Sequence, residues 1–136
     1  YDARRLAIIA GIIAPLVPRR DARILDVGCA TGRLLANLRD LGFPNVEGAD
    51  PSPACAAAAK RLYSIPVQTR TLAELGAAAA RYDVVILVGV LEHLCDLGEA
   101  FVHLRTILNR GGLLYVEVPD ATAFAELALR RPAIID

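Results

Sequence analysis

Residues 24–33 read ILDVGCATGR: an apolar run ends in glycine, and small residues then lead into a leucine-rich segment. This order predicts a buried strand, a tight loop and the start of a helix. Glycine lets the backbone of such a loop approach a ligand closely, and the first turn of the helix offers unpaired N–H groups. The stretch therefore predicts a ligand-binding turn between a strand and a helix.

Strand and helix patterns alternate after this turn, with one further helix before it. The run DVVILV at 83–88 is typical of a strand buried on both faces. The predicted elements are a helix over 2–17, a strand over 23–28, a helix over 31–41, a strand over 45–50, a helix over 52–62, a strand over 66–69, a helix over 71–80, a strand over 83–88, a helix over 97–108, a strand over 113–118 and a helix over 121–130. The alternation predicts an α/β fold, a doubly wound parallel sheet with strand order 3-2-1-4-5.

Turn and cap residues support these boundaries. Ser52 before Pro53 is a predicted helix start, and Thr71 with Glu74 three residues later forms a predicted capping box. Gly42 stands where a glycine ends a helix, and the segment 109–112 (NRGG) is expected to close the helix before the last strand.

Size and charge limit the functions that the chain can have. Its 136 residues, 55% of them hydrophobic, are enough for one domain over 1–136 with a core of its own. The 15 basic and 15 acidic residues balance, so no overall basic field favours nucleic acid or an anionic membrane as partner. Only Lys60 is lysine; with the high alanine content, this arginine bias indicates a GC-rich bacterial source.

The cysteine pattern favours a reducing compartment. Cys29, Cys55 and Cys95 are odd in number and far apart, which argues against a disulfide framework and a zinc site. We therefore predict a cytoplasmic protein without a bound metal. No apolar run is long enough for a membrane helix, and the apolar segment 6–17 is interpreted as a packing helix because Pro18-Arg19-Arg20 replaces a signal-peptide cleavage site.

An acidic residue ends the next predicted strand beside the glycine turn. Asp50 stands where a carboxylate can accept hydrogen bonds from both hydroxyls of a ribose. The combination indicates a cofactor that contains a nucleoside. The dinucleotide fingerprint is not met, because Ala30 and Arg33 stand where its second and third glycines are required.

Four segments resemble, in order, the motifs of the class I S-adenosylmethionine-dependent methyltransferases. ILDVGCATG is similar to the first motif, VEGADPSPACAAAAK to the acidic motif of the second strand, YDVVILVGVLEHLCD to the fourth-strand motif and LNRGGLLYVEVPD to the fifth-strand motif. The VEVPD ending resembles the branch that methylates small molecules. The resemblance implies a Rossmann-like fold, S-adenosylmethionine as cofactor and methyl transfer to a small-molecule acceptor.

The resemblance also implies site residues. Asp26 would organise the loop and the cofactor's amino group, the turn that follows would contact the methionine part, and Asp50 would bind the ribose. The residues implied in cofactor binding are Asp26, Gly28, Cys29, Ala30, Gly32, Asp50, Pro51, Ser52, Thr71, Leu72, Val88, Gly89 and Val90.

A catalytic base is needed only for a poor nucleophile, because a sulfonium methyl group is already activated. His93 is the candidate, since an imidazole can accept a proton near neutral pH. Glu92 beside it has a cofactor or substrate role or stabilises a helix start. Glu117, within a strand, is expected to form a structural ion pair.

The chain departs from the family pattern in three places. Ala30 replaces the central glycine, which costs little if its φ is negative. Arg70 and Thr71 occupy the place of an acid that often reads the adenine. The family fold has seven strands, whereas this sequence stops after the fifth strand and one helix, so the C-terminal strands are expected to be missing.

Two other functions remain open from the sequence. One is a cofactor-binding or interaction module that does not catalyse, and the other is an NAD-dependent oxidoreductase, which Ala30 and Arg33 disfavour. The sequence names neither the acceptor atom nor the oligomeric state.

Overall fold

A computed structural model describes residues 3–78 and 80–120 of the chain. Its sheet has the strand order β3-β2-β1-β4-β5, and every neighbouring pair is parallel. The strands are β1 (Ile24–Val27), β2 (Val46–Ala49), β3 (Val67–Gln68), β4 (Tyr82–Val88) and β5 (Leu108–Glu117). The predicted fold class and strand order are confirmed.

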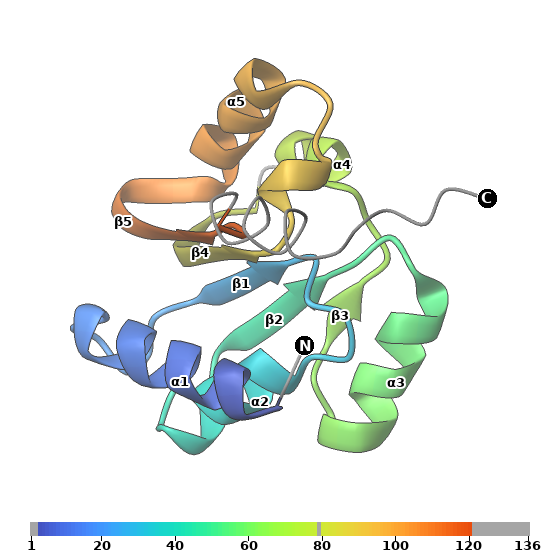
Figure 1. Ribbon diagram of the computed structural model, residues 1–136. Coiled ribbons are helices and arrows are strands. Elements are labelled where there is room, and N and C mark those ends of the chain that lie inside the picture. The colour runs from blue at the N-terminus through green and yellow to red at the C-terminus, as the bar shows by residue number, and fades with distance from the viewer. Residues whose placement is uncertain (1–2, 79, 121–136) are drawn as a thin grey trace, which may run out of the picture.

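Helices cover both faces of this sheet (Figure 1). The helices are α1 (Ala3–Ile13), α2 (Arg33–Asp40), α3 (Pro53–Tyr63), α4 (Leu72–Ala77) and α5 (Leu97–Ile107), with short 3₁₀ turns η1 (Ala14–Leu16) and η2 (Leu91–His93). Helices α1, α2 and α3 lie on one face, and α4 and α5 lie on the other. The strands therefore end together at one edge, where each crossover to a helix begins.

The two faces bury separate apolar cores because side chains alternate along each strand. Ile24 and Ile86 pack toward α1 and α2 with Leu35, whereas Leu25 and Val85 pack toward α4 and α5. These strand residues are all fully buried, as expected for a parallel sheet covered on both sides. The cores hold the strand ends, and so the site described below, in fixed positions.

Local signals place the helix starts. The Ser52 hydroxyl accepts a hydrogen bond from the Cys55 N–H at 3.4 Å, and Thr71 and Glu74 form the predicted capping box. Gly42 follows α2 with a φ of +95°, so the predicted glycine stop is confirmed as well.

The last strand begins earlier than predicted. Leu108 already pairs with Tyr82, so the segment 109–112 is an irregularity within β5 and not a turn before it. The Asn109 side chain donates to the Asp83 carboxylate at 2.8 Å, and Gly112 passes so close to the Asp83 carbonyl that a Cβ would lie 2.8 Å from it. The predicted helix over 121–130 lies outside the described residues.

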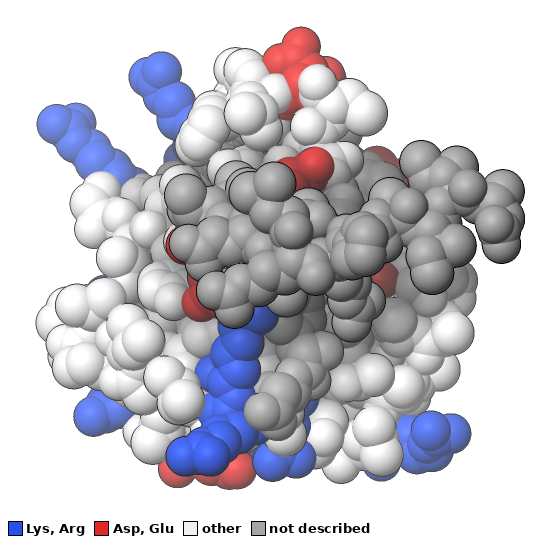
Figure 2. Space-filling view, viewed as in Figure 1, with Lys and Arg blue, Asp and Glu red and all other residues white. Residues whose placement is uncertain are grey.

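Basic and acidic side chains are interspersed on the face shown in Figure 2, in keeping with the balanced composition. Among the described residues, no helix combines the length and the apolar character that crossing a membrane requires.

Candidate functional site

Three residues with positive φ shape the turn between β1 and α2. Gly28 has a φ of +73°, Ala30 of +47° and Gly32 of +77°. Glycine adopts this conformation freely, but at Ala30 it costs about 1–2 kcal/mol. From the sequence we expect little cost at Ala30 if its φ is negative, but this φ is positive. Strain of this kind is typical of functional loops.

Hydrogen bonds from the backbone hold the strained turn in place. The N–H groups of Gly28 and Cys29 both donate to the Ala49 carbonyl, at 2.7 and 3.2 Å. The Gly32 N–H donates to the Cys29 carbonyl at 2.9 Å, which closes the turn at the start of α2. The end of β2 thus fixes the conformation of the loop after β1.

The Asp50 carboxylate is the second anchor of the turn. One of its oxygens accepts from the Ala30 N–H at 3.0 Å and the other from the Ser52 N–H at 2.9 Å. Each carboxylate oxygen has a further lone pair, so Asp50 can still accept hydrogen bonds from a ligand. It is half-buried at the carboxyl end of β2, beside the turn.

Asp26 is buried below the same turn and is 4% exposed. Burial, with the nearby charge of Asp50, raises its pKa to about 8. In the described parts of the chain, no hydrogen bond or cation balances this carboxyl group. A buried acid without a partner is costly unless a ligand or a proton neutralises it.

A cavity of about 300 Å³ opens above Asp26. Helix α1 covers one side of it with Ala3 and Leu6, and the amino terminus of α2 forms another. The residues that line it are Ala3, Leu6, Asp26, Gly28, Cys29, Ala30, Thr31, Arg33, Leu34, Tyr63, Val88 and Gly89. The cavity therefore lies at the carboxyl ends of β1 and β4, where ligands bind in this architecture.

The structure brings part of the predicted residue set together here. Those that line the cavity are Asp26, Gly28, Cys29, Ala30, Val88 and Gly89. Asp50 and Gly32 join them through the hydrogen bonds of the turn, and Val90 lies against Gly28.

The other predicted residues lie at the same edge, outside the cavity lining. Pro51 and Ser52 begin the crossover to α3. Leu72 is the first residue of α4, and its side chain is buried in the core between α4, α5 and the sheet. The Thr71 hydroxyl donates to the Glu74 carboxylate at 2.8 Å and accepts from the Glu74 N–H at 3.3 Å. The Thr71 side chain is thus engaged in capping α4.

His93 and Glu92 are exposed in the turn η2 after β4. Neither lines the cavity. The His93 N–H donates to the Val90 carbonyl at 2.9 Å, so the backbone of η2 continues directly from the residues at the end of β4.

Sequence reasoning missed the part of the site contributed by α1, Arg33 and Tyr63. The first turn of α1 is tied to the end of β5 because Arg5 bonds the Glu117 carboxylate, which also accepts from the Tyr115 hydroxyl at 3.2 Å. The ion pair expected for Glu117 is confirmed. No spacing in the sequence indicates that residues this far apart meet.

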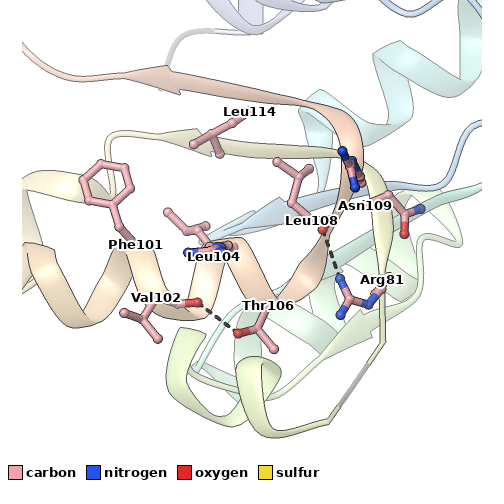
Figure 3. Close-up of a pocket in the computed structure, with 10 residues that line it drawn as sticks. Arg81, Phe101, Val102, Leu104, Thr106, Leu108, Asn109 and Leu114 are labelled. Atoms are coloured by element: carbon pink, nitrogen blue, oxygen red, sulfur yellow. Dashed lines mark hydrogen bonds between the residues drawn. The ribbon is translucent and has the colours of Figure 1, made fainter.

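A larger hollow, of about 870 Å³, lies between α5 and β5 (Figure 3). Apolar side chains such as Phe101 and Leu114 line it, and Arg81 donates to the Leu108 carbonyl at 3.4 Å at one end. Leu108 pairs with the first residue of β4, so this hollow extends toward the opposite edge of the sheet from Asp26. None of the described residues that line it is both buried and polar, so its chemistry does not indicate a reaction site.

Gly28 is expected to tolerate no side chain. A Cβ there would lie 2.4 Å from a Val90 methyl carbon, and the φ of +73° is itself unfavourable. Gly28→Ala should lower the free energy of unfolding by roughly 3 kcal/mol, the sum of a left-handed alanine and an overpacked contact. Denaturation in urea measures this loss.

A second substitution separates the two causes. Val90→Ala in the Gly28→Ala background should restore the steric part and leave the backbone part. Gly11→Ala is the matched control, because a Cβ at Gly11 in α1 meets nothing within 4 Å. That substitution should be neutral or stabilising, and a stable Gly28→Ala protein would contradict the described turn.

Comparison with known proteins gives one family. A family model described as "Methyltransferase domain" matches residues 1–133. A ubiquinone biosynthesis O-methyltransferase of Azorhizobium caulinodans is 32% identical over 127 residues, covering 90% of this chain and 46% of that protein. The same enzyme of Cereibacter sphaeroides is 36% identical over 107 residues, covering 74% and 42%. The chain thus spans about half the length of these relatives.

Similar solved structures are also methyltransferases. A sugar N-methyltransferase from Streptoalloteichus is 29% identical with a TM-score of 0.64, covering 86% of this chain and 47% of that one. An amino pentose methyltransferase from Micromonospora echinaspora, solved with SAM, is also 29% identical with a TM-score of 0.67, covering 86% and 50%. A plantazolicin methyltransferase bound to SAH has a TM-score of 0.75 at 16% identity, covering 96% and 51%, which shows the shared fold.

Proposed function

Because the chain belongs to the methyltransferase-domain family, we propose that it binds S-adenosylmethionine and transfers the methyl group to a small-molecule acceptor. The two ubiquinone biosynthesis enzymes named above are O-methyltransferases and the sugar enzyme is an N-methyltransferase, which supports the reaction class. We propose further that residues 1–136 are part of a single cofactor-binding domain.

The observation that carries the proposal is the unpartnered Asp26 below a turn that begins and ends with a glycine of positive φ. Asp26 is 4% exposed and lines a cavity whose wall at Gly28 has no room for a Cβ. A ligand with a cationic group near Asp26 and a flat or thin part along the turn fits this arrangement. The methionine end of S-adenosylmethionine, with its ammonium group, has these properties.

The other residues of the edge extend the site. We propose that Asp50 accepts hydrogen bonds from the ribose hydroxyls, using the lone pairs that Ala30 and Ser52 leave open. The backbone of the strained turn between β1 and α2 would then contact the methionine part of the cofactor. We propose that Pro51, Ser52, Thr71 and Leu72 lie toward the adenine.

The bound cofactor supplies a methyl group on a positively charged sulfur, which a nucleophile displaces in line. The protein's contribution is to align the acceptor and exclude water. Val88, Gly89 and Val90 would line the cofactor near this point. We propose His93 at the mouth as the group that accepts a proton from a poorly nucleophilic acceptor.

The cysteines, the relatives and the cavity support a cellular compartment, a source and a kind of partner for this protein. Cys29, Cys55 and Cys95 form no disulfide, which supports a reducing, cytoplasmic compartment. The relatives with named organisms are bacterial, which supports a bacterial source. We propose a small molecule as the partner of this site, because a cavity of about 300 Å³ suits a small ligand.

Titration calorimetry of the purified chain tests cofactor binding directly. We expect micromolar binding of S-adenosylmethionine and of its demethylated product, S-adenosylhomocysteine, and no binding of NAD. The reason is that Arg33 and Ala30 occupy the glycine positions of a dinucleotide site.

Each other outcome has a defined meaning. NAD binding alone would replace the proposal by an oxidoreductase. Cofactor binding without any methyl transfer to O- or N-nucleophilic acceptors would favour a non-catalytic module. Binding of none of the three compounds would contradict the proposed function.

A further inference from the structure

The Gln68 carbonyl joins Asp50 to the loop that follows β3. It accepts hydrogen bonds from the Asp50 N–H and from the Arg70 N–H, each at 3.0 Å. The backbones of Asp50 and Arg70 therefore lie side by side at the carboxyl edge of the sheet. Under the proposed function, on which this inference rests, Asp50 binds the ribose of the cofactor. Arg70 then lies beside the group that the ribose carries.

The strand order places the base of the cofactor at this loop. Strands β1, β2 and β3 are consecutive neighbours in the sheet (Figure 1), and adjacent strands lie about 4.8 Å apart. The cofactor is a linear molecule, with the methionine part at one end, the ribose in the middle and the base at the other end. With the methionine part at the turn after β1 and the ribose at Asp50 after β2, the base extends to the end of β3.

Arg70 is the charged side chain that the loop after β3 exposes. Thr69 before it is exposed as well. In the parts of the chain that the structure describes, no carboxylate lies within ion-pair distance of the Arg70 guanidinium group. A guanidinium carries N–H donors and no acceptor, so Arg70 can only donate to a base.

Glu74, the carboxylate next along the chain, is turned back onto the start of α4. One of its oxygens accepts from the Thr71 N–H at 2.7 Å and from the Thr71 hydroxyl at 2.8 Å. These hydrogen bonds, with a smaller contribution from the charge of Arg70, lower the pKa of the Glu74 carboxyl group. The loop therefore presents a cationic donor to the base, and its neighbouring carboxylate is engaged in capping a helix.

Purines differ in what they offer to such a donor. Adenine has an amino group at position 6, which needs an acceptor, whereas hypoxanthine has a carbonyl oxygen there, which accepts. At the N7 edge, an arginine can donate to both O6 and N7 of a 6-oxopurine but only to N7 of adenine. At the N1 edge, it can donate to O6 of the first base or to N1 of the second. On either edge, the 6-oxopurine makes at least as many hydrogen bonds with Arg70 as adenine does.

We infer that the site reads the purine through Arg70 and does not select for the 6-amino group of adenine, so that it takes a cofactor with a hypoxanthine base at least as readily. Arg70 is then the residue that determines the specificity for the base. The site binds S-inosyl compounds as well as S-adenosyl compounds.

Two ligands that share all but the base test this inference. S-Adenosylhomocysteine and S-inosylhomocysteine have the same ribose, thioether and amino acid end. In titration calorimetry, the wild-type chain should bind S-inosylhomocysteine as tightly as S-adenosylhomocysteine or up to about tenfold more tightly. Arg70→Glu should reverse this order and favour S-adenosylhomocysteine by about ten- to a hundredfold, because a carboxylate accepts from the amino group and repels the carbonyl oxygen.

Two further variants separate base recognition from effects on the fold. Arg70→Gln places a neutral amide near Glu74, and this amide can both donate and accept, so the ratio of the two affinities should shift a few-fold toward S-adenosylhomocysteine. Arg61→Glu is the matched control, with the same change of charge at an exposed arginine in the last turn of α3. It should keep the wild-type ratio. A general loss of stability would weaken both ligands alike and leave this ratio unchanged.

Two results would overturn the inference. One is a wild-type chain that binds S-inosylhomocysteine more weakly than S-adenosylhomocysteine; if Glu74→Gln then removed this preference, the group that reads the base would be the Glu74 carboxylate. The other is an Arg70→Glu chain that keeps the wild-type ratio. Both would leave the proposed function intact, because S-adenosylhomocysteine still binds. Binding of neither ligand would contradict the proposed function, and the inference with it.

Discussion

Asp50→Ala should reduce cofactor affinity by about a hundredfold or more. Two hydrogen bonds from ribose hydroxyls to a charged carboxylate would be lost, each worth roughly 1.5–3 kcal/mol, and about 1.4 kcal/mol corresponds to a factor of ten. The same substitution frees the Ala30 N–H, which Asp50 holds at 3.0 Å, so the strained turn would also lose an anchor. Calorimetric titration with S-adenosylhomocysteine measures the change.

The controls for this prediction separate binding from turnover. Asp50→Asn keeps one acceptor oxygen and should bind more tightly than Asp50→Ala. His93→Ala should bind S-adenosylhomocysteine as the wild type does, because His93 is exposed outside the cavity lining, and should affect methyl transfer alone. If a folded Asp50→Ala chain bound normally, the site would have to lie elsewhere.

The second large effect concerns Asp26 and pH. The pKa of its carboxyl group is about 8 in the folded chain and near 3.8 in the unfolded chain. Between these values the folded chain carries a proton that the unfolded chain has released. The free energy of unfolding should therefore fall as pH rises from about 4 to about 8, with a slope from this group approaching 1.4 kcal/mol per pH unit.

Asp26→Asn should remove this slope, because an amide does not ionise. The stabilising contribution of the protonated acid is fully present at the low end of the range and is lost at its high end. The variant should therefore be more stable than the wild type at pH 8, while binding S-adenosylhomocysteine more weakly. Urea denaturation at a series of pH values measures the effect. Asp40→Asn, which removes an exposed carboxylate from α2, should keep the wild-type slope; a slope unchanged in Asp26→Asn would refute the prediction.

Patterns within one element predicted most of the fold. The run at 83–88 is a strand buried on both faces, and Thr71 with Glu74 starts a helix, because burial and capping depend on residues close in sequence. Parallel strands joined by helices leave few topologies, so the strand order followed. Asp50 and the glycine turn were predicted to be neighbours for the same reason, and Asp50 does bond the turn.

What the sequence did not predict depends on distant contacts. The positive φ of Ala30 follows from the Ala49 carbonyl and the Asp50 carboxylate, which fix the turn from a neighbouring strand. The meeting of Arg33 with Tyr63 joins α2 to the end of α3, and the early start of β5 depends on Asn109 bonding Asp83. Neither the hydrophobic periodicity of the sequence nor the spacing of its motifs predicts such pairs.

Helix α1 is attached to the sheet in two different ways along its length. Ile9 and Ile13 are buried in the core, whereas the first turn is held by the bond of Arg5 to Glu117 and covers the cavity with Leu6. Helix ends fray far more readily than buried segments open. A ligand could thus exchange through the frayed end of α1 while the rest of the helix stays packed. Substitutions in the first turn of α1 would then change the rate of ligand exchange, and substitutions in its buried part would change the global stability.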